Sequence, residues 1–199
     1  MSVTLNASTS SGLVQTADTS GTIELQSNGT TRLTVASTGA YGQLVQGTAV
    51  ASTSGTSIDF TSIPSWVRRI TVMFNGVSTS GTSNIQVQIG AGSVTTSGYV
   101  SSIIGGSTGN VLSGTTATSG FLCVQQLVAS YLNNGQVVIT SANTNLWVAS
   151  SVMTTSTTGS GVIGGGSITL GGTLDRVRIT TVNGTDTFDA GTINILYEG

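Results

Sequence analysis

Histidine and lysine are both absent from this chain of 199 residues. Without histidine the chain lacks the side chain that most often serves as a general base near pH 7, so neither a Ser-His-Asp triad nor a histidine-ligated zinc site can form. Without lysine there is no amine for a Schiff base and no phosphate-binding P-loop lysine. We therefore predict that the protein is not an enzyme.

Cysteine, proline and charge are also scarce. The chain has one cysteine and one proline, and its seven acidic residues against five arginines give a net charge of −2. A single cysteine cannot form a disulfide within the chain. The basic surface that nucleic-acid binding requires is missing, and no apolar run reaches the roughly 18 residues of a membrane-spanning helix. We expect no nucleic-acid partner and no insertion into a membrane.

Threonine, serine and glycine are what the chain has in abundance. Its 35 Thr, 29 Ser and 28 Gly make up almost half of all residues. Apolar residues are nevertheless 37% and charged residues only 6%, with a mean hydropathy of +0.29, whereas disordered chains show the opposite balance. Valine and isoleucine dominate the apolar set, and with threonine they are β-branched residues that favour strands. The composition indicates a folded β protein.

Period-two alternation recurs along the chain, broken by clusters of Gly, Ser, Thr and Asn. It is clearest at 85–89, 70–74, 176–179 and 193–197, with weaker strand candidates at 57–60, 99–104, 120–129, 136–141, 145–153 and 167–171. The glycine runs at 105–106 and 164–166 suit loops or close backbone contacts. Many short strands with turn signals between them predict an all-β fold, a β-sandwich of jelly-roll-like type.

Residues 1–55 differ from the rest because they hold too few large apolar side chains to enclose a core of their own. A hairpin is predicted around Ser27-Asn28-Gly29. A two-residue turn would pair Ile23 with Thr34, whereas a three-residue turn pairs Ile23 with Leu33 and places the apolar residues on one face, so we favour the second register. An isolated hairpin is marginally stable in water, so its apolar face must pack against another surface. We therefore divide the chain into an N-terminal attachment and oligomerisation arm, 1–55, and a C-terminal β-sandwich domain, 56–199.

Three segments resemble virion structural proteins of tailed bacteriophages, often described as tail or tail-fibre proteins. They are residues 60–78 (FTSIPSWVRRITVMFNGVS), residues 171–191 (GGTLDRVRITTVNGTDTFDAG) and the opening hairpin, 21–39. The resemblance implies a homo-oligomer, often a trimer, without a cofactor. It matches no set of receptor-contact residues.

The function expected from this resemblance is a tail-fibre or tail-tip component used in host attachment, located in the virion and assembled in the host cytoplasm. Its partners would be copies of itself in a homotrimer, other virion proteins through the arm, and host surface polysaccharide. The alternative is a capsid decoration (cement) or connector protein without host contact. A polysaccharide depolymerase is disfavoured because the chain is small and its acidic residues are few.

Two regions are candidates for receptor contact, because sugar-binding surfaces combine an aromatic ring with amide groups. Trp147 lies near Asn145, and Tyr131 lies beside Asn133. The alternative reading of both regions is ordinary strand aromatics with ordinary loops.

For the remaining charged residues and the cysteine we predict structural roles. Asp175, Asp186 and Asp189 form the densest group of carboxylates, and turn capping is favoured for them over a calcium site or catalysis. Cys123 follows apolar neighbours and is expected to be a buried structural cysteine. We expect either Arg68 or Arg69 to pair with an acidic residue, with Asp59 as the candidate partner. Arg176 and Arg178 are expected on a solvated or intersubunit face.

Overall fold

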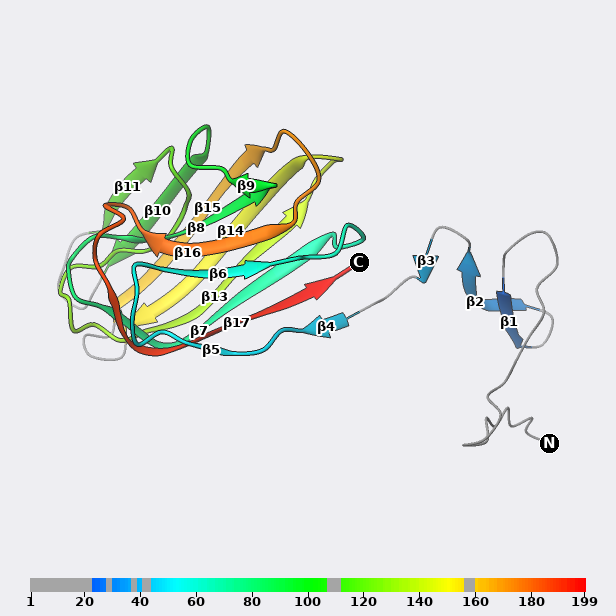
Figure 1. Cartoon of the computed structure of the whole chain (residues 1–199), viewed down its shortest axis with the longest axis horizontal. Helices are drawn as coiled ribbons and strands as arrows, with labels where there is room; N and C mark the ends of the chain where they lie inside the picture. Colours follow the sequence, from blue (N-terminus) through cyan, green and yellow to red (C-terminus); the bar gives the residue numbers. More distant parts are fainter. Residues whose placement is uncertain (1–22, 28–29, 37–38, 41–43, 107–111, 156–159) are drawn as a thin grey trace. The chain divides into compact units, whose positions relative to one another are not determined.

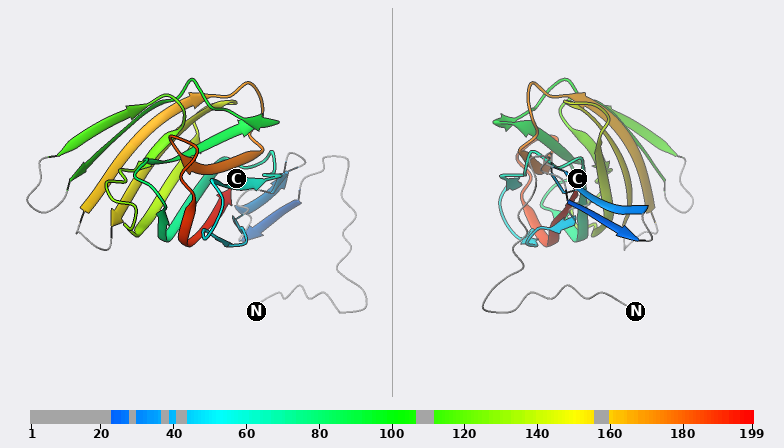
Figure 2. Two further views of the ribbon diagram at one scale, coloured as in Figure 1. Left: turned by 60° about the vertical axis from the view of Figure 1, so that its left-hand side comes forward. Right: turned by 90° about the vertical axis from the view of Figure 1, so that its right-hand side faces the viewer.

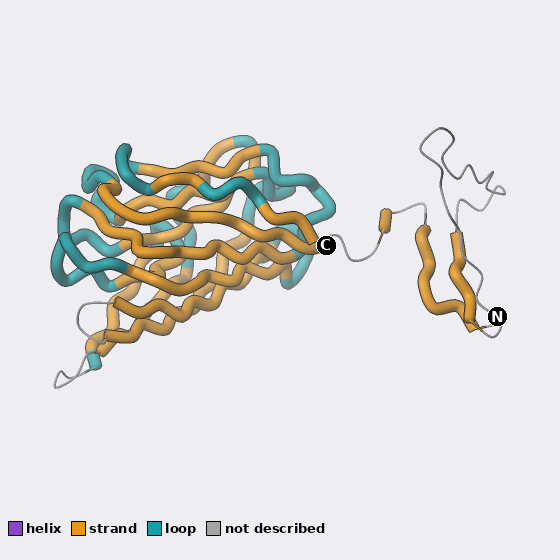
Figure 3. The backbone as a smooth tube through the Cα atoms, turned by 90° about the horizontal axis from the view of Figure 1, so that it is seen from below, coloured by secondary structure: helices purple, strands orange, loops and turns teal. Residues whose placement is uncertain are grey.

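A computed structural model describes residues 44–106, 112–155 and 160–199 in full, and 23–27, 30–36 and 39–40 by their backbone. These residues divide between two compact units, Met1–Gly42 and Gln43–Gly199. The described parts of both units consist of strands and loops, with no helix (Figure 3). The predicted all-β class is thus confirmed.

The smaller unit contains a three-stranded antiparallel sheet in the order β1 (Ile23–Ser27), β2 (Thr30–Ala36), β3 (Gly39–Ala40). The predicted hairpin is present, but the favoured register is wrong. Ser27 pairs with Thr30, and the register then shifts between Leu25 and Gln26. The shift brings Leu25 opposite Leu33 and Ile23 opposite Val35. A bulge, not a longer turn, therefore aligns the apolar residues.

The larger unit contains two antiparallel sheets, which makes it sandwich-like (Figures 1 and 2). The large sheet has nine strands, in the order β11-β10-β15-β14-β13-β7-β17-β4, with β5 also paired to β17. Its strands are β4 (Leu44–Gln46), β5 (Val50–Ala51), β7 (Arg69–Thr79), β10 (Val100–Gly106), β11 (Ser113–Ala117), β13 (Asn133–Ser141), β14 (Leu146–Thr155), β15 (Ser160–Thr169) and β17 (Phe188–Glu198).

The small sheet has the order β12-β8-β16-β6, with β9 paired to β8. Its strands are β6 (Ser57–Thr61), β8 (Ile85–Ala91), β9 (Ser93–Val94), β12 (Phe121–Val124) and β16 (Arg176–Thr181). In Figure 1 strands β6 and β16 cross in front of the strands of the large sheet, and the right-hand view of Figure 2 shows the two layers side by side.

The core lies between the two sheets, where the alternating residues predicted from sequence point inward. Ile70 and Val72 of β7, like Val177 and Ile179 of β16, have no exposed surface. Tyr99 packs edge-on against Phe121 with the ring centroids 5.0 Å apart. The period-two pattern therefore identified the buried faces of these strands.

One strand is buried more completely than its pattern predicts. Gln86 and Gln88 of β8 alternate with isoleucine and valine, yet they are only 2% and 5% exposed. The reason is the turn at Ser119, whose hydroxyl donates to Gln86 Oε1 at 2.8 Å and whose carbonyl accepts a hydrogen bond from Gln88 Nε2 at 2.8 Å. A loop with little apolar content covers this face, which alternation could not reveal.

The predicted boundary at residue 55 differs from the division between the two compact units. Strands β4 and β5, which fall in the predicted arm, pair with β17 of the larger unit. Ser52 is fully buried, and its hydroxyl donates to the carbonyl of Ala190 at 2.7 Å. Residues from 44 onward therefore pack with the large unit.

Candidate functional site

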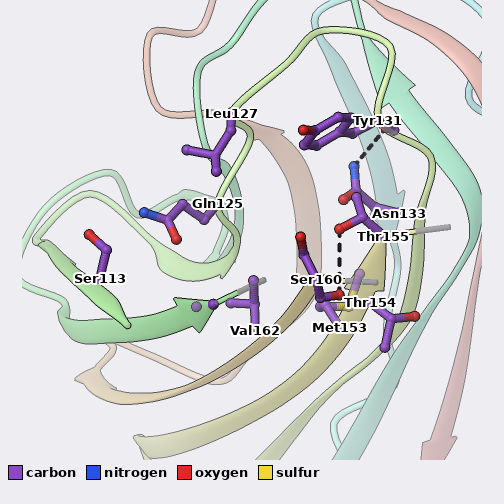
Figure 4. Close-up of a pocket in the computed structure, with 12 residues that line it drawn as sticks. Ser113, Gln125, Leu127, Tyr131, Asn133, Met153, Thr154, Thr155, Ser160 and Val162 are labelled. Atoms are coloured by element: carbon purple, nitrogen blue, oxygen red, sulfur yellow. Dashed lines mark hydrogen bonds between the residues drawn. The ribbon is translucent and has the colours of Figure 1, made fainter. Parts of the chain in front are cut away.

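A pocket of about 410 Å³ lies where several strands of the large sheet end. Strands β10 and β14 end there, β11, β13 and β15 begin there, and the segment between β12 and β13 closes one side (Figure 4). In the close-up, Tyr131 and Leu127 lie on one side and Val162 and Met153 on the other. The lining consists of Gly105, Gly106, Ser113, Gln125, Leu127, Tyr131, Asn133, Met153, Thr154, Thr155, Ser160 and Val162.

Buried amide groups hold the segment that carries Tyr131. Asn133 is 2% exposed, and its Nδ2 donates to Gln126 Oε1 at 2.8 Å, to the carbonyl of Val77 at 3.0 Å and to that of Tyr131 at 3.1 Å. Gln126 in turn donates from Nε2 to the carbonyl of Val128 at 2.9 Å. Since buried polar groups are costly to leave unpaired, this network fixes the position of the loop.

The lining is chemically neutral. None of its residues is charged, and hydroxyl and amide groups alternate with the apolar side chains of Leu127, Met153 and Val162. A side chain at Gly105 would begin within 2.7 Å of Gln125 Oε1, so the missing Cβ makes room for this amide. The described lining residues can offer hydrogen bonds and an aromatic ring, but no counter-ion, to a ligand.

The structure brings together two of the four predicted receptor-contact residues. Tyr131 is half-buried and lines the pocket with Asn133. The side-chain nitrogen of Asn133 already donates its hydrogen bonds to other groups of the protein, so this residue stabilises the loop. The other lining residues come from segments that are distant in sequence and share no motif, so sequence reasoning missed them.

The other two predicted contact residues lie outside this pocket. Trp147 is 3% exposed, so its ring belongs to the core, and its Nε1 has no hydrogen-bond partner among the described residues. Asn145 is half-buried at the β13–β14 turn, where its carbonyl accepts a hydrogen bond from the backbone of Leu170 at 2.9 Å. When the side-chain amide of Asn145 is turned so that its nitrogen faces the carbonyls of Thr144 and Gly172, it donates a hydrogen bond to each, at 2.9 and 3.1 Å. These positions fit the structural alternative; a receptor contact at either residue stays a prediction.

Asp175 and Asp186 hold loops, as the turn-capping prediction expects, whereas Asp189 joins strands β7 and β17. Asp175 accepts hydrogen bonds from the backbone of Gly92 at 3.1 Å and from Arg176 Nε at 2.8 Å. The hydrogen bond from Arg176 is the main reason that the pKa of Asp175 lies below its ordinary value. Asp186 accepts from the backbone of Ser83 at 3.0 Å, and Asp189 accepts from the hydroxyl of Ser78. Among the described residues no group of three or more Cys, Asp or Glu could hold a metal ion.

The ion pairs correct one predicted partner. Asp59 pairs with Arg178, not with Arg68 or Arg69, because Arg178 lies directly opposite it on the neighbouring strand. The contact has two hydrogen bonds, of 2.7 and 2.9 Å. Arg69 does meet an acidic residue, Glu198, at 3.7 Å. Both pairs are exposed, so each contributes little to stability.

Cys123 is a free, fully buried cysteine, as predicted. Its thiol donates to the carbonyl of Ile85 at 3.4 Å, and burial raises its pKa well above the ordinary value. Such a thiol is unreactive at neutral pH.

Comparisons with known proteins identify no family for this chain. The residues that the structure describes contain no helix long and apolar enough to cross a membrane. No protein-family model, no curated protein and no solved structure matches this chain.

Proposed function

We propose that this chain is a structural protein of a bacteriophage virion, a tail-fibre or tail-tip component that takes part in host attachment. The resemblance of residues 60–78 and 171–191 to such proteins motivates the proposal, and the pocket beside Tyr131 is the observation that carries the attachment role. In this proposal the predicted arm of residues 1–55 joins other virion proteins through residues 1–42, while residues 44–55 pack with the sandwich. The sandwich is jelly-roll-like, and copies assemble as a homotrimer.

The chemistry of the pocket favours an uncharged sugar unit of the host surface polysaccharide. A pyranose has an apolar face that packs on an aromatic ring and hydroxyl groups that exchange hydrogen bonds with amides and hydroxyls. Tyr131 and Leu127 supply the apolar surface, and Gln125 and Ser113 supply polar groups. An anionic sugar would find no cation among the described lining residues. Symmetric copies would strengthen a weak single contact through multivalency.

Adsorption measured with phage particles that carry Tyr131→Ala tests the attachment role. Loss of the ring removes a surface on which a sugar can stack. We expect adsorption to fall at least about tenfold, because the weaker contact is repeated in every copy of the chain on the particle. Val182→Ala, an exposed side chain outside the pocket, is the matched control. Normal adsorption by Tyr131→Ala particles with folded protein would remove the attachment role.

The connector or decoration alternative is supported by one observation, the separation of residues 1–42 as a compact unit of their own. Antibody labelling of intact particles separates the two functions. Label at the tail supports the attachment protein, label over the head supports the decoration protein, and unlabelled particles contradict both.

A further inference from the structure

The charged residues of the larger unit lie in its first 27 and last 25 residues and leave a long uncharged stretch between them. Residues 70–174 contain no charged residue at all. Strands β10, β11, β13, β14 and β15, which are neighbours in the large sheet, all fall in this stretch. Five adjacent strands therefore present a surface without any charge, whereas exposed sheet faces of soluble monomers usually carry charges.

One face of these strands packs on the small sheet, because β12 lies across β10, β14 and β15. The opposite face carries a row of aliphatic residues in direct register. Ile104 of β10 pairs with Ile163 of β15, and Ile163 pairs with Val152 of β14. Their side chains are 39%, 58% and 59% exposed. Exposed apolar residues that align across three strands mark an interaction surface.

A second row lies four residues away along the strands. Val100 and Val148, which are 72% and 40% exposed, flank Ser167. Between the two rows lie only small residues, Ser102, Gly165 and Ser150, which pair in the same manner. A shallow depression of about 260 Å³ is lined in part by Ile104, Ile163 and Gly165. The face therefore has aliphatic ridges separated by a band of small residues.

The edge of this surface is also unprotected. Among the described strands β11 pairs with β10 alone, so its outer backbone groups are open. It has no charge, no proline and no register shift, which are the features that usually prevent an edge strand from pairing with another chain.

We propose that this charge-free face, with the β11 edge, is the surface through which copies of this chain associate. A second copy is the favoured occupant because a surface without charge offers no pattern to select a different partner, and because the aliphatic ridges of one copy can pack on the band of small residues of the next, a heterologous contact of the kind that closes a trimer. At a strand spacing of about 4.8 Å and a rise of about 3.4 Å per residue, the five strands cover roughly 650 Å². That is close to the roughly 800 Å² that each partner buries in a stable interface. The inference rests on the self-association included in the proposed function.

Sedimentation velocity of the full chain tests the inference with two matched substitutions. Val152→Arg places a charge at one end of the first row, and Val45→Arg places the same charge on an exposed valine of β4, at the opposite end of the large sheet from β11. We expect Val152→Arg to weaken association at least tenfold and Val45→Arg to leave it unchanged. Thermal unfolding of both variants verifies the fold. Val152→Ser, which removes apolar surface without adding charge, should weaken association less, and it serves as the test if Val152→Arg does not fold.

The results distinguish this inference from the proposed function. If Val152→Arg associates like the unchanged chain, or if Val45→Arg weakens association equally, the face is wrong although self-association stands. If the unchanged chain is a monomer at every concentration, self-association and the face both fail. Virion membership is decided separately, by labelling of the particles.

Discussion

Tyr99 shows how the core accommodates a polar group. Its ring is 1% exposed, and its hydroxyl accepts a hydrogen bond from the backbone of Ile89 at 2.8 Å and lies 3.1 Å from the carbonyls of Ile89 and Thr95. Burial raises the pKa of Tyr99 from 10.0 to about 12, because the phenolate would lose its solvation. The hydroxyl thus links β8 to the segment before β10, and the hydrogen bond that it donates to a carbonyl is lost when it ionises.

Tyr99→Phe should lower the free energy of unfolding at pH 7 by about 1–3 kcal/mol, because a buried backbone group loses its partner. The folded pKa lies above the unfolded one, so the stabilisation from Tyr99 is complete below pH 10 and is lost as the pH rises toward 12. Urea unfolding at a series of alkaline pH values measures both effects. The variant should show a smaller alkaline decline than the unchanged protein, and equal declines would contradict this account.

At the scale of the element, the glycine run of β15 has a packing role. Sequence reasoning placed residues 164–166 in a loop or at a close backbone contact; the structure places them inside β15, between β10 and β14. A Cβ on Gly166 would lie 2.4 Å from the carbonyl oxygen of Val100 and 3.1 Å from the ring of Phe121. The absence of a side chain is what lets β10 and Phe121 approach this strand.

Gly166→Ala should therefore destabilise the protein by about 1–3 kcal/mol, the usual effect of overpacking. Gly161→Ala is a matched control in the same strand, because a Cβ there meets nothing within 4 Å. The midpoints of urea unfolding compare the two variants. A loss of stability in Gly161→Ala as large as that in Gly166→Ala would show that strand propensity, not packing, decides the effect.

For the whole molecule, the boundary between the two units matters most. The backbone nitrogen of Gly47 donates to Ile195 at 2.7 Å and that of Ser52 donates to Gly191 at 2.9 Å, in addition to the pairing of β4 and β5 with β17. Residues 44–55 thus complete one side of the large sheet, although their side chains are mostly exposed.

Two truncated chains test this boundary. Residues 43–199 should fold and melt within a few degrees of the full chain, because they form a compact unit of their own. Residues 56–199 should melt at least about 4 °C lower, since a loss of about 2 kcal/mol shifts the midpoint by that much in a protein of this size. Calorimetry gives both midpoints. Equal midpoints for the two truncated chains would support the boundary at residue 55 instead.

The sequence by itself determined the class of the protein and the inward faces of its strands. Alternation at Ile70, Val72, Val177 and Ile179 reports burial directly, because successive side chains of a strand point to opposite faces. The burial of Cys123 was readable for a similar reason, since its neighbours are apolar.

Only the tertiary structure decided which segments meet. Asp59 finds Arg178, Gln125 lines a pocket with Met153, and Ile104, Ile163 and Val152 form one row, all through pairing between strands distant in the chain. β11 has no apolar side chain larger than alanine, so no pattern predicted it. Local alternation fixes the direction of a side chain, but strand order and register fix its neighbours, and these depend on backbone pairing across the whole fold.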